Sequence, residues 1–414
     1  MTHGSGKTIR HYPCFIEAFS EAAKGYGIPP KFVHWAAIHA VAVALGRDVR
    51  GINGKGITWP NLFILFVAPP TTGKSLAELL VGPFLGAIGA KLSAQVMSGA
   101  SMLDELANAE VPALGENLQF NHSLTILSSE FGQTFPGYDT EVFAKLSYLW
   151  DCPEVVRERK RSQNKGEPIV IDRVCLNMLA GVQPTVLTGI FPQSAWTGGF
   201  LTRTIFAYEP MPKRLALRPR PGDDTPVTVQ MDEETRKKLE ADLMSIAQMH
   251  GLMDEGEGYA EEYYNWLEKD REEPAPHHPQ LFYYNGRREH LIEKLSIISA
   301  ASRGSMTMIG RDYLRARSWL EDTERNLDDM FLELTQTEDK TIMVNLNHYV
   351  WRETMRKGVK ALTGVQIREY ISSQVPMERV DMFLEQACKH QYLAKGHAKG
   401  GIEVYAPMTI NKME

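Results

Sequence analysis

The feature that most constrains this chain is a continuous apolar run at residues 62–68 that stops abruptly at two prolines. An unbroken apolar run of this length is typical of a parallel strand that is covered on both faces. Shorter apolar runs at 123–127, 174–180 and 204–208 are separated by segments with a helical pattern. Strands that alternate with helices predict βαβ units, so we expect an α/β fold with a mainly parallel sheet.

The chain has 414 residues, which is too long for one ordinary domain. We expect four regions: N-terminal helices at 1–57, the sheet-containing core at 58–225, a helical region with an acidic insertion at 226–335, and a C-terminal domain at 341–414. Hydrophobic residues make up 43% of the chain and charged residues 23%, which excludes a mostly disordered or fibrous protein.

The net charge of −6 is unevenly distributed. Residues 231–280 hold 14 acids and 5 bases, a net −9, so the rest of the chain carries +3. The four cysteines lie far apart without a CxxC pair, which argues against a disulfide framework and a zinc site. There is no signal peptide and no apolar run near the ~20 residues that cross a bilayer, so we expect a soluble protein of the reducing cytoplasm with no membrane partner.

The first apolar run leads directly into a loop, residues 68–75, with the spacing GxxxxGK[ST] and Ala68 at its first position. Such a loop offers backbone N–H groups and a helix N-terminus to phosphate oxygens. Lys74 would bind the β- and γ-phosphates and Ser75 would bind Mg²⁺, so we expect ATP and Mg²⁺ as cofactors. The alternative is a turn that needs Gly73 only for its backbone conformation. The residues expected to hold the nucleotide are Pro70, Thr71, Thr72, Gly73, Lys74, Ser75 and Leu76.

Two further strand ends carry polar residues of the kind that an ATPase needs. The run at 123–127 leads into Ser129 and Glu130, which places Glu130 to polarise an attacking water. Ordinary sites have an aspartate immediately before that glutamate, so the expected metal-binding set here is Ser75, Ser129 and Glu130. The next strand ends in Gln183, whose amide could contact the γ-phosphate or the water. The alternatives are a helix-capping Glu130 and an ordinary loop glutamine.

An arginine follows a glycine-rich stretch just before the last strand. Gly198 and Gly199 precede Arg203, which in turn precedes the apolar run at 204–208. An arginine fixed at a strand edge suits insertion into the site of a neighbouring subunit, where it would neutralise transition-state charge. The alternative is a surface arginine in a salt bridge, and the sequence leaves both open.

In this order, the motifs resemble the AAA+ ATPase core of the minichromosome maintenance (MCM) branch of hexameric DNA helicases, and the MCM-like helicases of phages and mobile elements. The resemblance covers about 58–330 and implies a homo-hexamer that hydrolyses ATP, translocates on single-stranded DNA and opens forked DNA in the cytoplasm of a bacterial host. It makes Gln183 the sensor 1 residue, Arg203 the arginine finger and Arg287 the sensor 2 residue that closes the lid, with Arg288 next in line. The departures from the family pattern are Ala68, Ser129 and Gln183.

A basic hairpin is expected between the Glu130 and Gln183 strands. β-Branched runs flank an Asn-Lys-Gly turn, which is a hairpin signal. In a ring, its cations would point into the pore and follow DNA phosphates, as the family's pre-sensor-1 hairpin does. The alternative is a solvated edge hairpin. The candidate DNA contacts are Arg157, Arg159, Lys160, Arg161 and Lys165.

The sequence pattern of the C-terminal domain predicts a winged helix. A helix from about 363, a turn, a second helix at 377–390 and two strand-like segments follow one another, and 341–414 carries a net +3. Lys395 and Lys399 lie in the expected wing, so we expect DNA binding, with protein contacts as the alternative.

Two rival functions remain open: an origin-binding initiator or helicase loader without unwinding activity, and a non-catalytic nucleotide-gated adaptor. The acidic block is expected to be a solvated helical face, with a site for a replication partner protein as the alternative.

Overall fold

The computed structural model describes residues 10–54, 56–115, 119–137, 139–158, 168–191, 195–196, 198–210, 231–273, 276, 278, 281–398 and 400–408. The chain divides into two compact units, Met1–Met330 and Phe331–Glu414. The expected mixed α/β class is confirmed, because parallel strands alternate with helices in the first unit. The regions expected at 1–57 and 58–225 both belong to that first unit.

Unit 1 contains a five-stranded sheet in the order β4-β5-β8-β3-β9. The strands β5, β8, β3 and β9 are parallel, and β4 pairs antiparallel with β5 at one edge. The four expected apolar strands are therefore present and adjacent. Their bounds are β3 Phe63–Val67, β4 Glu110–Pro112, β5 Phe120–Ser128, β8 Val174–Val182 and β9 Thr204–Tyr208.

Both faces of this sheet are covered, as the unbroken apolar strands require. Phe63 and Phe66 of β3 are an odd number of residues apart and so point to opposite faces. Phe66 stacks on Phe32 of α2, with ring centroids 4.5 Å apart. Phe63 packs against Phe200, with ring centroids 6.0 Å apart, in an aromatic cluster that also contains Phe131 of α5.

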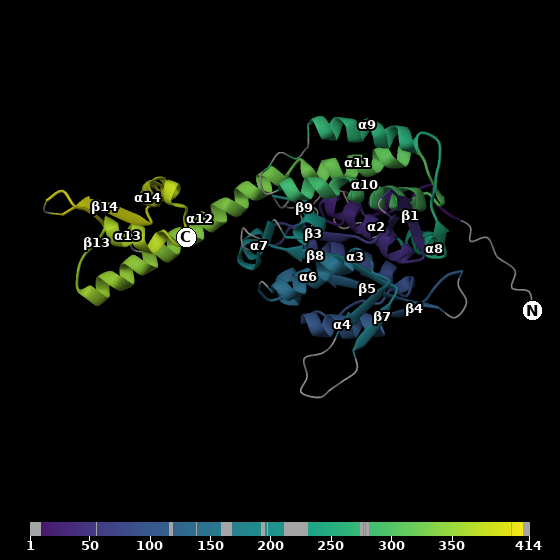
Figure 1. The fold of residues 1–414 in the computed structure, drawn as a ribbon, viewed down its shortest axis with the longest axis horizontal. Coiled ribbons are helices and arrows are strands. Elements are labelled where there is room, and N and C mark those ends of the chain that lie inside the picture. The colour runs from purple at the N-terminus through teal and green to yellow at the C-terminus, as the bar shows by residue number, and fades with distance from the viewer. Residues whose placement is uncertain are drawn as a thin grey trace, which may run out of the picture. The chain divides into compact units, whose positions relative to one another are not determined.

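The helices of unit 1 surround the sheet (Figure 1). The helix α2 is apolar nearly all round, and its buried residues extend over its whole length, from Phe32 to Leu45. The helices of this unit are α1 Phe15–Ala22, α2 Pro30–Leu45, α3 Lys74–Ala87, α4 Gly99–Asn108, α5 Phe131–Thr134, α6 Thr140–Leu149, α7 Pro184–Ile190, α8 Glu233–Ile246, α9 Tyr259–Glu272, α10 Phe282–Ser302 and α11 Gly310–Glu324.

Short strands form three smaller sheets. The two strands expected to flank the basic turn form an antiparallel pair, β6 Val155–Glu158 and β7 Ile169–Asp172, while residues 159–167 between them lie outside the described residues. The other two sheets are β10-β1-β2, with β1 Val49–Asn53, β2 Gly56–Thr58 and β10 Gly251–Leu252, and β11-β12, with β11 Asp254–Glu255 and β12 Thr307–Met308.

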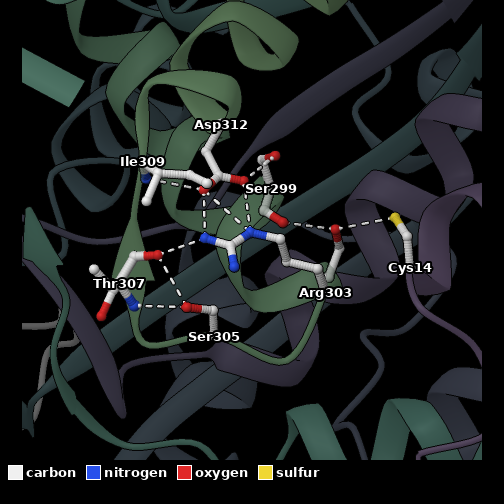
Figure 2. Close-up of polar contacts among 8 residues, drawn as sticks. Cys14, Ser299, Arg303, Ser305, Thr307, Ile309 and Asp312 are labelled. Atoms are coloured by element: carbon white, nitrogen blue, oxygen red, sulfur yellow. Dashed lines mark hydrogen bonds and ion pairs between the residues drawn. The ribbon is translucent and has the colours of Figure 1, made fainter. Parts of the chain in front are cut away.

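A buried polar network fixes the corner between α10 and α11 (Figure 2). The Asp312 carboxylate accepts from Ser299 Oγ at 2.8 Å, from the Arg303 guanidinium at 2.7 Å and from the backbone N–H of Ile309 at 3.0 Å. Cys14 Sγ lies 3.4 Å from the Ser302 hydroxyl, which joins the start of α1 to this corner. Because every partner of Asp312 comes from the two helices or their connection, the network holds α10 against α11.

Unit 2 is built on the C-terminal part of α12 (Leu327–Lys357). It contains an antiparallel sheet in the order β13-β15-β14. A capping box starts α13, because the side chains of Thr363 and Gln366 each bond to the other residue's backbone N–H. The remaining elements are β13 Leu362–Thr363, α13 Gly364–Ile371, the 3₁₀ turn η4 Met377–Arg379, α14 Val380–Lys389, β14 Leu393–His397 and β15 Glu403–Pro407.

Candidate functional site

The loop between β3 and α3 has the backbone of an anion-binding turn. Thr71 (φ 67°) and Gly73 (φ 97°) both lie in the left-handed region. Where left-handed and right-handed backbone conformations alternate, successive N–H groups point toward one side of the loop. They then form a concavity that can bind an anion. Thr72 Oγ1 donates to the Pro69 carbonyl at 2.7 Å and ties the loop together. Gly73 packs closely on the 27–29 segment, where an added Cβ would meet Pro29 Cδ at 3.3 Å.

Lys74 is the first residue of α3 and is buried. Its Nζ donates to the carbonyl oxygens of Ala68 at 2.5 Å and Pro69 at 2.8 Å. Burial lowers the pKa of Lys74, and the negative charge of Glu130 opposes that shift. The structure therefore brings Lys74 and Glu130 into electrostatic range of each other, and the ammonium group is held directly over the loop.

Glu130 is positioned by the end of β5. Ser128 Oγ accepts from the Glu130 backbone N–H at 3.3 Å and from Thr134 Oγ1 at 2.7 Å, which fixes the turn into α5. In the part of the chain that the structure describes, the buried Oε1 of Glu130 has no hydrogen-bond partner. A buried carboxylate oxygen ordinarily has a donor, a water or a metal ion, so this atom fits a bound water or metal-bound water at the site.

Ser129 contacts two neighbouring elements. On one side it lies near Glu78 of α3: burial raises the pKa of Glu78, and the Ser129 hydroxyl opposes that rise. On the other side, Gly181 of β8 presses against the Ser129 backbone. Sequence reasoning missed Glu78. The available signal was its position four residues after Lys74, which places both side chains on one face of α3.

Gln183 lies beside the loop. The Ala68 N–H donates to the Val182 carbonyl at 3.1 Å, so the residue after Val182 is held next to the first residue of the loop. Gln183 is half-buried and precedes α7, and its side chain forms no capping hydrogen bond there. The structure thus brings Lys74, Glu130 and Gln183 to the carboxyl ends of three adjacent parallel strands. The exposed Ser75 opens α3 on the same side.

Arg203 lies at the opposite end of the sheet. It belongs to the 3₁₀ turn η2 (Leu201–Arg203), immediately before β9, whereas the loop follows β3. Since β9 and β3 are parallel and paired over five residues, the strand separates the two by roughly 13 Å. The guanidinium donates to the Gly199 carbonyl at 2.9 Å and to Asp151 Oδ2 at 3.3 Å, and it lies 5.5 Å from the Trp150 ring centroid.

Arg287 lies near Arg203. Burial lowers the pKa of Arg203, and the charge of Arg287 lowers it further. These two arginines therefore gather at the amino ends of the strands, away from Lys74. Arg288 is engaged within the fold. Its guanidinium is buried and ion-paired with Glu324 at 2.7 Å and with Asp270.

A cavity of about 550 Å³ adjoins the loop. Thr72 of the loop, Glu209 after β9 and the 27–30 segment between α1 and α2 are among its lining residues. Its volume falls in the range of small-molecule sites. This cavity could not be predicted from the sequence, because its walls come from segments that are distant in the chain.

The expected DNA contacts are only partly described. Arg157 is exposed on β6. Lys395 on β14 is ion-paired with Glu403, which also binds Arg368, and these two cations lower the pKa of Glu403 to about 2. Much of the Lys395 charge is thus neutralised within unit 2. Arg159, Lys160, Arg161, Lys165 and Lys399 lie outside the described residues.

No protein-family model matches the chain, and no curated protein matches it. Among the helices that the structure describes, none is both long and apolar enough to cross a membrane. Within the same residues, no three His, Cys, Asp or Glu side chains gather into a metal site.

Proposed function

We propose that this chain is an ATP hydrolase of the MCM-like AAA+ type that assembles into a hexamer and acts as a DNA helicase in the replication of a phage or mobile element. The observation that carries the proposal is the convergence of Lys74, Glu130 and Gln183 at the carboxyl ends of β3, β5 and β8. Adjacent parallel strands place their terminal residues together, which is where open α/β sheets bind ligands. The backbone of the loop and the unpartnered Glu130 Oε1 fit a triphosphate and its attacking water.

Each residue of this group has a definite role in the proposal. The loop N–H groups and Lys74 bind the β- and γ-phosphates, and the adjoining cavity takes the nucleoside. Ser75, Ser129 and Glu130 are the residues that would hold Mg²⁺, which would neutralise phosphate charge when bound with the nucleotide. Glu130 accepts a proton from the attacking water. The Gln183 amide orients that water against the γ-phosphate.

Catalysis is completed by a second subunit. Arg203 and Arg287 lie together at the other end of the sheet, so neither reaches the phosphates held by its own Lys74. In a closed ring, the end of each subunit that carries Arg203 would face the nucleotide of the next subunit. Head-to-tail interfaces of this kind form a ring when the rotation between subunits brings the last one back to the first. The sequence led us to expect that Arg287 closes the lid over the nucleotide of its own subunit. In this proposal Arg287 acts instead in the site of the neighbouring subunit.

DNA contacts come from two places in the proposal. The β6–β7 hairpin offers Arg157 on an exposed strand edge. In unit 2, α13 and α14 are followed by the antiparallel strands β14 and β15, the element order of a winged helix. Lys395 is already paired with Glu403, so we assign the wing a weaker share of phosphate binding than the hairpin.

The test is the rate of ATP hydrolysis with and without single-stranded DNA, run alongside light-scattering mass. We expect stimulation by DNA and a mass that corresponds to a hexamer with ATP bound. A lone protomer that hydrolyses ATP at full rate would contradict the proposal. Strand release from a forked duplex separates a helicase from an origin-binding initiator or loader, which would bind and hydrolyse without unwinding.

A further inference from the structure

A tryptophan is exposed on the outer face of α12 in unit 2. Trp351 is 50% exposed, Met355 one turn later is 68% exposed, and Val359 just past the end of the helix is 45% exposed. The opposite face of α12 is buried, because Leu346 and Val350 belong to the hydrophobic core of unit 2. Apolar side chains scattered singly on a surface are ordinary, whereas three at a spacing of four residues form a continuous apolar row.

A basic row runs beside this apolar row. His348, Arg352 and Arg356 are also spaced by four residues, and each arginine directly follows a member of the apolar row. Residues four apart are neighbours on a helix surface, so the two rows lie side by side along α12. The side chains of Arg352 and Arg356 are 70% and 68% exposed. The His348 ring lies edge-on to the Trp351 ring, with centroids 6.3 Å apart, and so links the two rows.

The basic row carries more positive charge than its acidic neighbour neutralises. Residues 345–360 contain four lysines and arginines against one acid, a net +3. That acid, Glu353, is ion-paired with Arg356 at 2.6 Å. Its carboxylate lies 4.0 Å from Arg352 Nε, at the outer limit of an ion pair. Arg352, next to Trp351, is therefore available to an anionic ligand.

We infer that this face of α12, formed by Trp351, Met355, Arg352 and Arg356, binds single-stranded DNA. Unpaired bases stack on the Trp351 ring, and the two arginines bind phosphates of the same strand. Proteins that bind single strands without sequence preference combine these two features, an aromatic platform for bases and a cationic track for the backbone. The inference rests on the proposed function and adds a third DNA contact to the hairpin and the wing.

Two observations favour a single strand over other occupants of this face. An exposed indole ring binds a base that presents an open face, and the bases of a duplex are already stacked on one another. A protein-docking surface ordinarily keeps charged residues out of its apolar centre. Here Arg352 and Arg356 lie directly beside the apolar row, so the surface suits a ligand that carries rings and negative charges together.

The test compares two forms of DNA on the full chain without nucleotide. A fluorescently labelled oligothymidine strand, alone or annealed to its complement, is titrated with protein, and fluorescence anisotropy is recorded. We expect Trp351→Ala to raise the Kd for the single strand about 5- to 150-fold, the range for loss of one base–aromatic stack. The Kd for the duplex should stay within about twofold. Trp351→Phe should keep most of the single-strand affinity, because a phenyl ring also stacks on bases.

Arg352→Ala tests the basic row. It should reduce the slope of log K against log salt by about 0.7, the value for one phosphate contact on a single strand. Two exposed residues of unit 1 provide matched controls. Phe282→Ala in α10, where the side chain is 72% exposed, and Arg271→Ala in α9 should both bind DNA like the wild type.

A cross-link on the wild-type chain measures proximity without any substitution. A single strand that contains 5-iododeoxyuridine is bound and irradiated, and the modified peptides are identified by mass spectrometry. We expect the peptide that contains Trp351 among them. If Trp351→Ala does not fold by circular dichroism, this experiment decides, and cross-links that never include that peptide overturn the inference.

The remaining outcomes separate the inference from the proposed function. Unchanged single-strand affinity in Trp351→Ala, or an equal loss for single strand and duplex, overturns the inference and leaves the ATPase proposal standing. Unchanged DNA affinity with a lower light-scattering mass would assign this face to contacts between copies of the chain, which also overturns it. A wild-type chain that hydrolyses ATP but binds neither form of DNA overturns the helicase proposal together with the inference.

Discussion

Gly181, near the end of β8, lies directly against the backbone carbonyl of Ser129 at the end of β5. A Cβ built on Gly181 would approach that oxygen to well under 3.0 Å and would also touch Lys74 Cβ at 3.2 Å. One glycine therefore lets the strand that ends in Gln183, the strand that ends in Glu130 and the helix that starts at Lys74 come together. The spacing of the candidate site depends on the absence of a side chain at this position.

Gly181→Ala should consequently disrupt the site. The added methyl group meets backbone rather than a flexible side chain, so we expect a loss of about 1–3 kcal/mol in the free energy of unfolding, typical of overpacking. Displacement of Ser129 should also lower ATP hydrolysis by about 100-fold, because misplacement by about 1 Å has that effect. Urea unfolding and a steady-state ATPase assay measure the two effects.

Gly82→Ala is the matched control for this substitution. Gly82 lies within α3, and an added Cβ there meets nothing within 4 Å. Alanine favours a helix interior over glycine by about 1 kcal/mol, so this variant should be slightly more stable and fully active. If both variants have the same free energy of unfolding and the same ATPase rate, the contact between Gly181 and Ser129 contributes to neither stability nor activity.

Glu130→Gln should separate stability from activity. Oε1 of Glu130 is buried and without a partner among the described residues, and a neutral amide is less costly there than a charged carboxylate. We expect the melting temperature to rise by a few degrees, which corresponds to about 1 kcal/mol. Loss of the general base should lower kcat by 10²- to 10⁴-fold, to an order of magnitude.

The check is a thermal melt beside an ATPase assay, with nucleotide affinity measured by a fluorescent analogue. Affinity should be retained, since Lys74 and the loop are unchanged. A variant that hydrolyses ATP at the wild-type rate would remove Glu130 from the proposed mechanism. A melting temperature below that of the wild type would show instead that attraction to Lys74 outweighs the cost of the unpartnered oxygen.

The sequence was sufficient for the central strands and the loop. The apolar run before Ala68 predicted a buried parallel strand, which the structure shows; the run that ends near Gln183 is its neighbour in the sheet, and the run that ends near Glu130 lies one strand further along. Unbroken apolar patterning and local motif spacing are encoded within a few residues, which is why they could be predicted. The antiparallel hairpin at β6–β7 was predicted for the same reason, from β-branched runs around a turn.

The contacts that depend on tertiary packing could not be predicted. The close approach of Gly181 to Ser129 joins residues from different elements, and no periodicity indicates it. The proximity of Arg287 to Arg203 likewise depends on how α10 packs beside η2, so the sequence could name both arginines but not their grouping. The pairing of Lys395 with Glu403 across β14 and β15 required the strand register.

Glu403 should make unit 2 sensitive to acid. Its side chain binds Lys395 and Arg368, which lower its pKa from 4.5 to about 2. A carboxylate whose folded-state pKa is depressed contributes stability above its unfolded-state value and loses it as the pH falls through the folded-state value. Stability from this group should therefore be complete above about pH 4.5 and decline toward pH 2.

Glu403→Gln should remove that part of the pH dependence. Carbon-detected NMR of the carboxyl group measures the pKa directly, and hydrogen exchange at the amides of β14 and β15 reports unit 2 alone. Glu385→Gln, an exposed glutamate on α14, should leave the acid response unchanged. A Glu403 pKa near 4.5 would show that the two ion pairs do not form in solution.

Arg203→Ala should bind nucleotide normally but lose turnover. Arg203 lies at the end of β9 opposite the loop, so its removal leaves Lys74 and the phosphate-binding backbone intact. If Arg203 acts in a neighbouring site, the loss should be of the order of 10³- to 10⁵-fold in kcat, as for other arginine fingers. Lys74→Ala should instead lose nucleotide affinity.

Mixing these two inactive variants tests whether the site is shared. In a ring of randomly mixed subunits, about one quarter of the junctions would combine an intact Lys74 with an intact Arg203 from the next subunit. Partial ATPase activity should therefore return on mixing, at a level that depends on the mixing ratio and vanishes for either variant alone. Since β9 and β3 are parallel and hold Arg203 away from its own Lys74, a mixture without any activity would mean that the two residues never serve the same nucleotide.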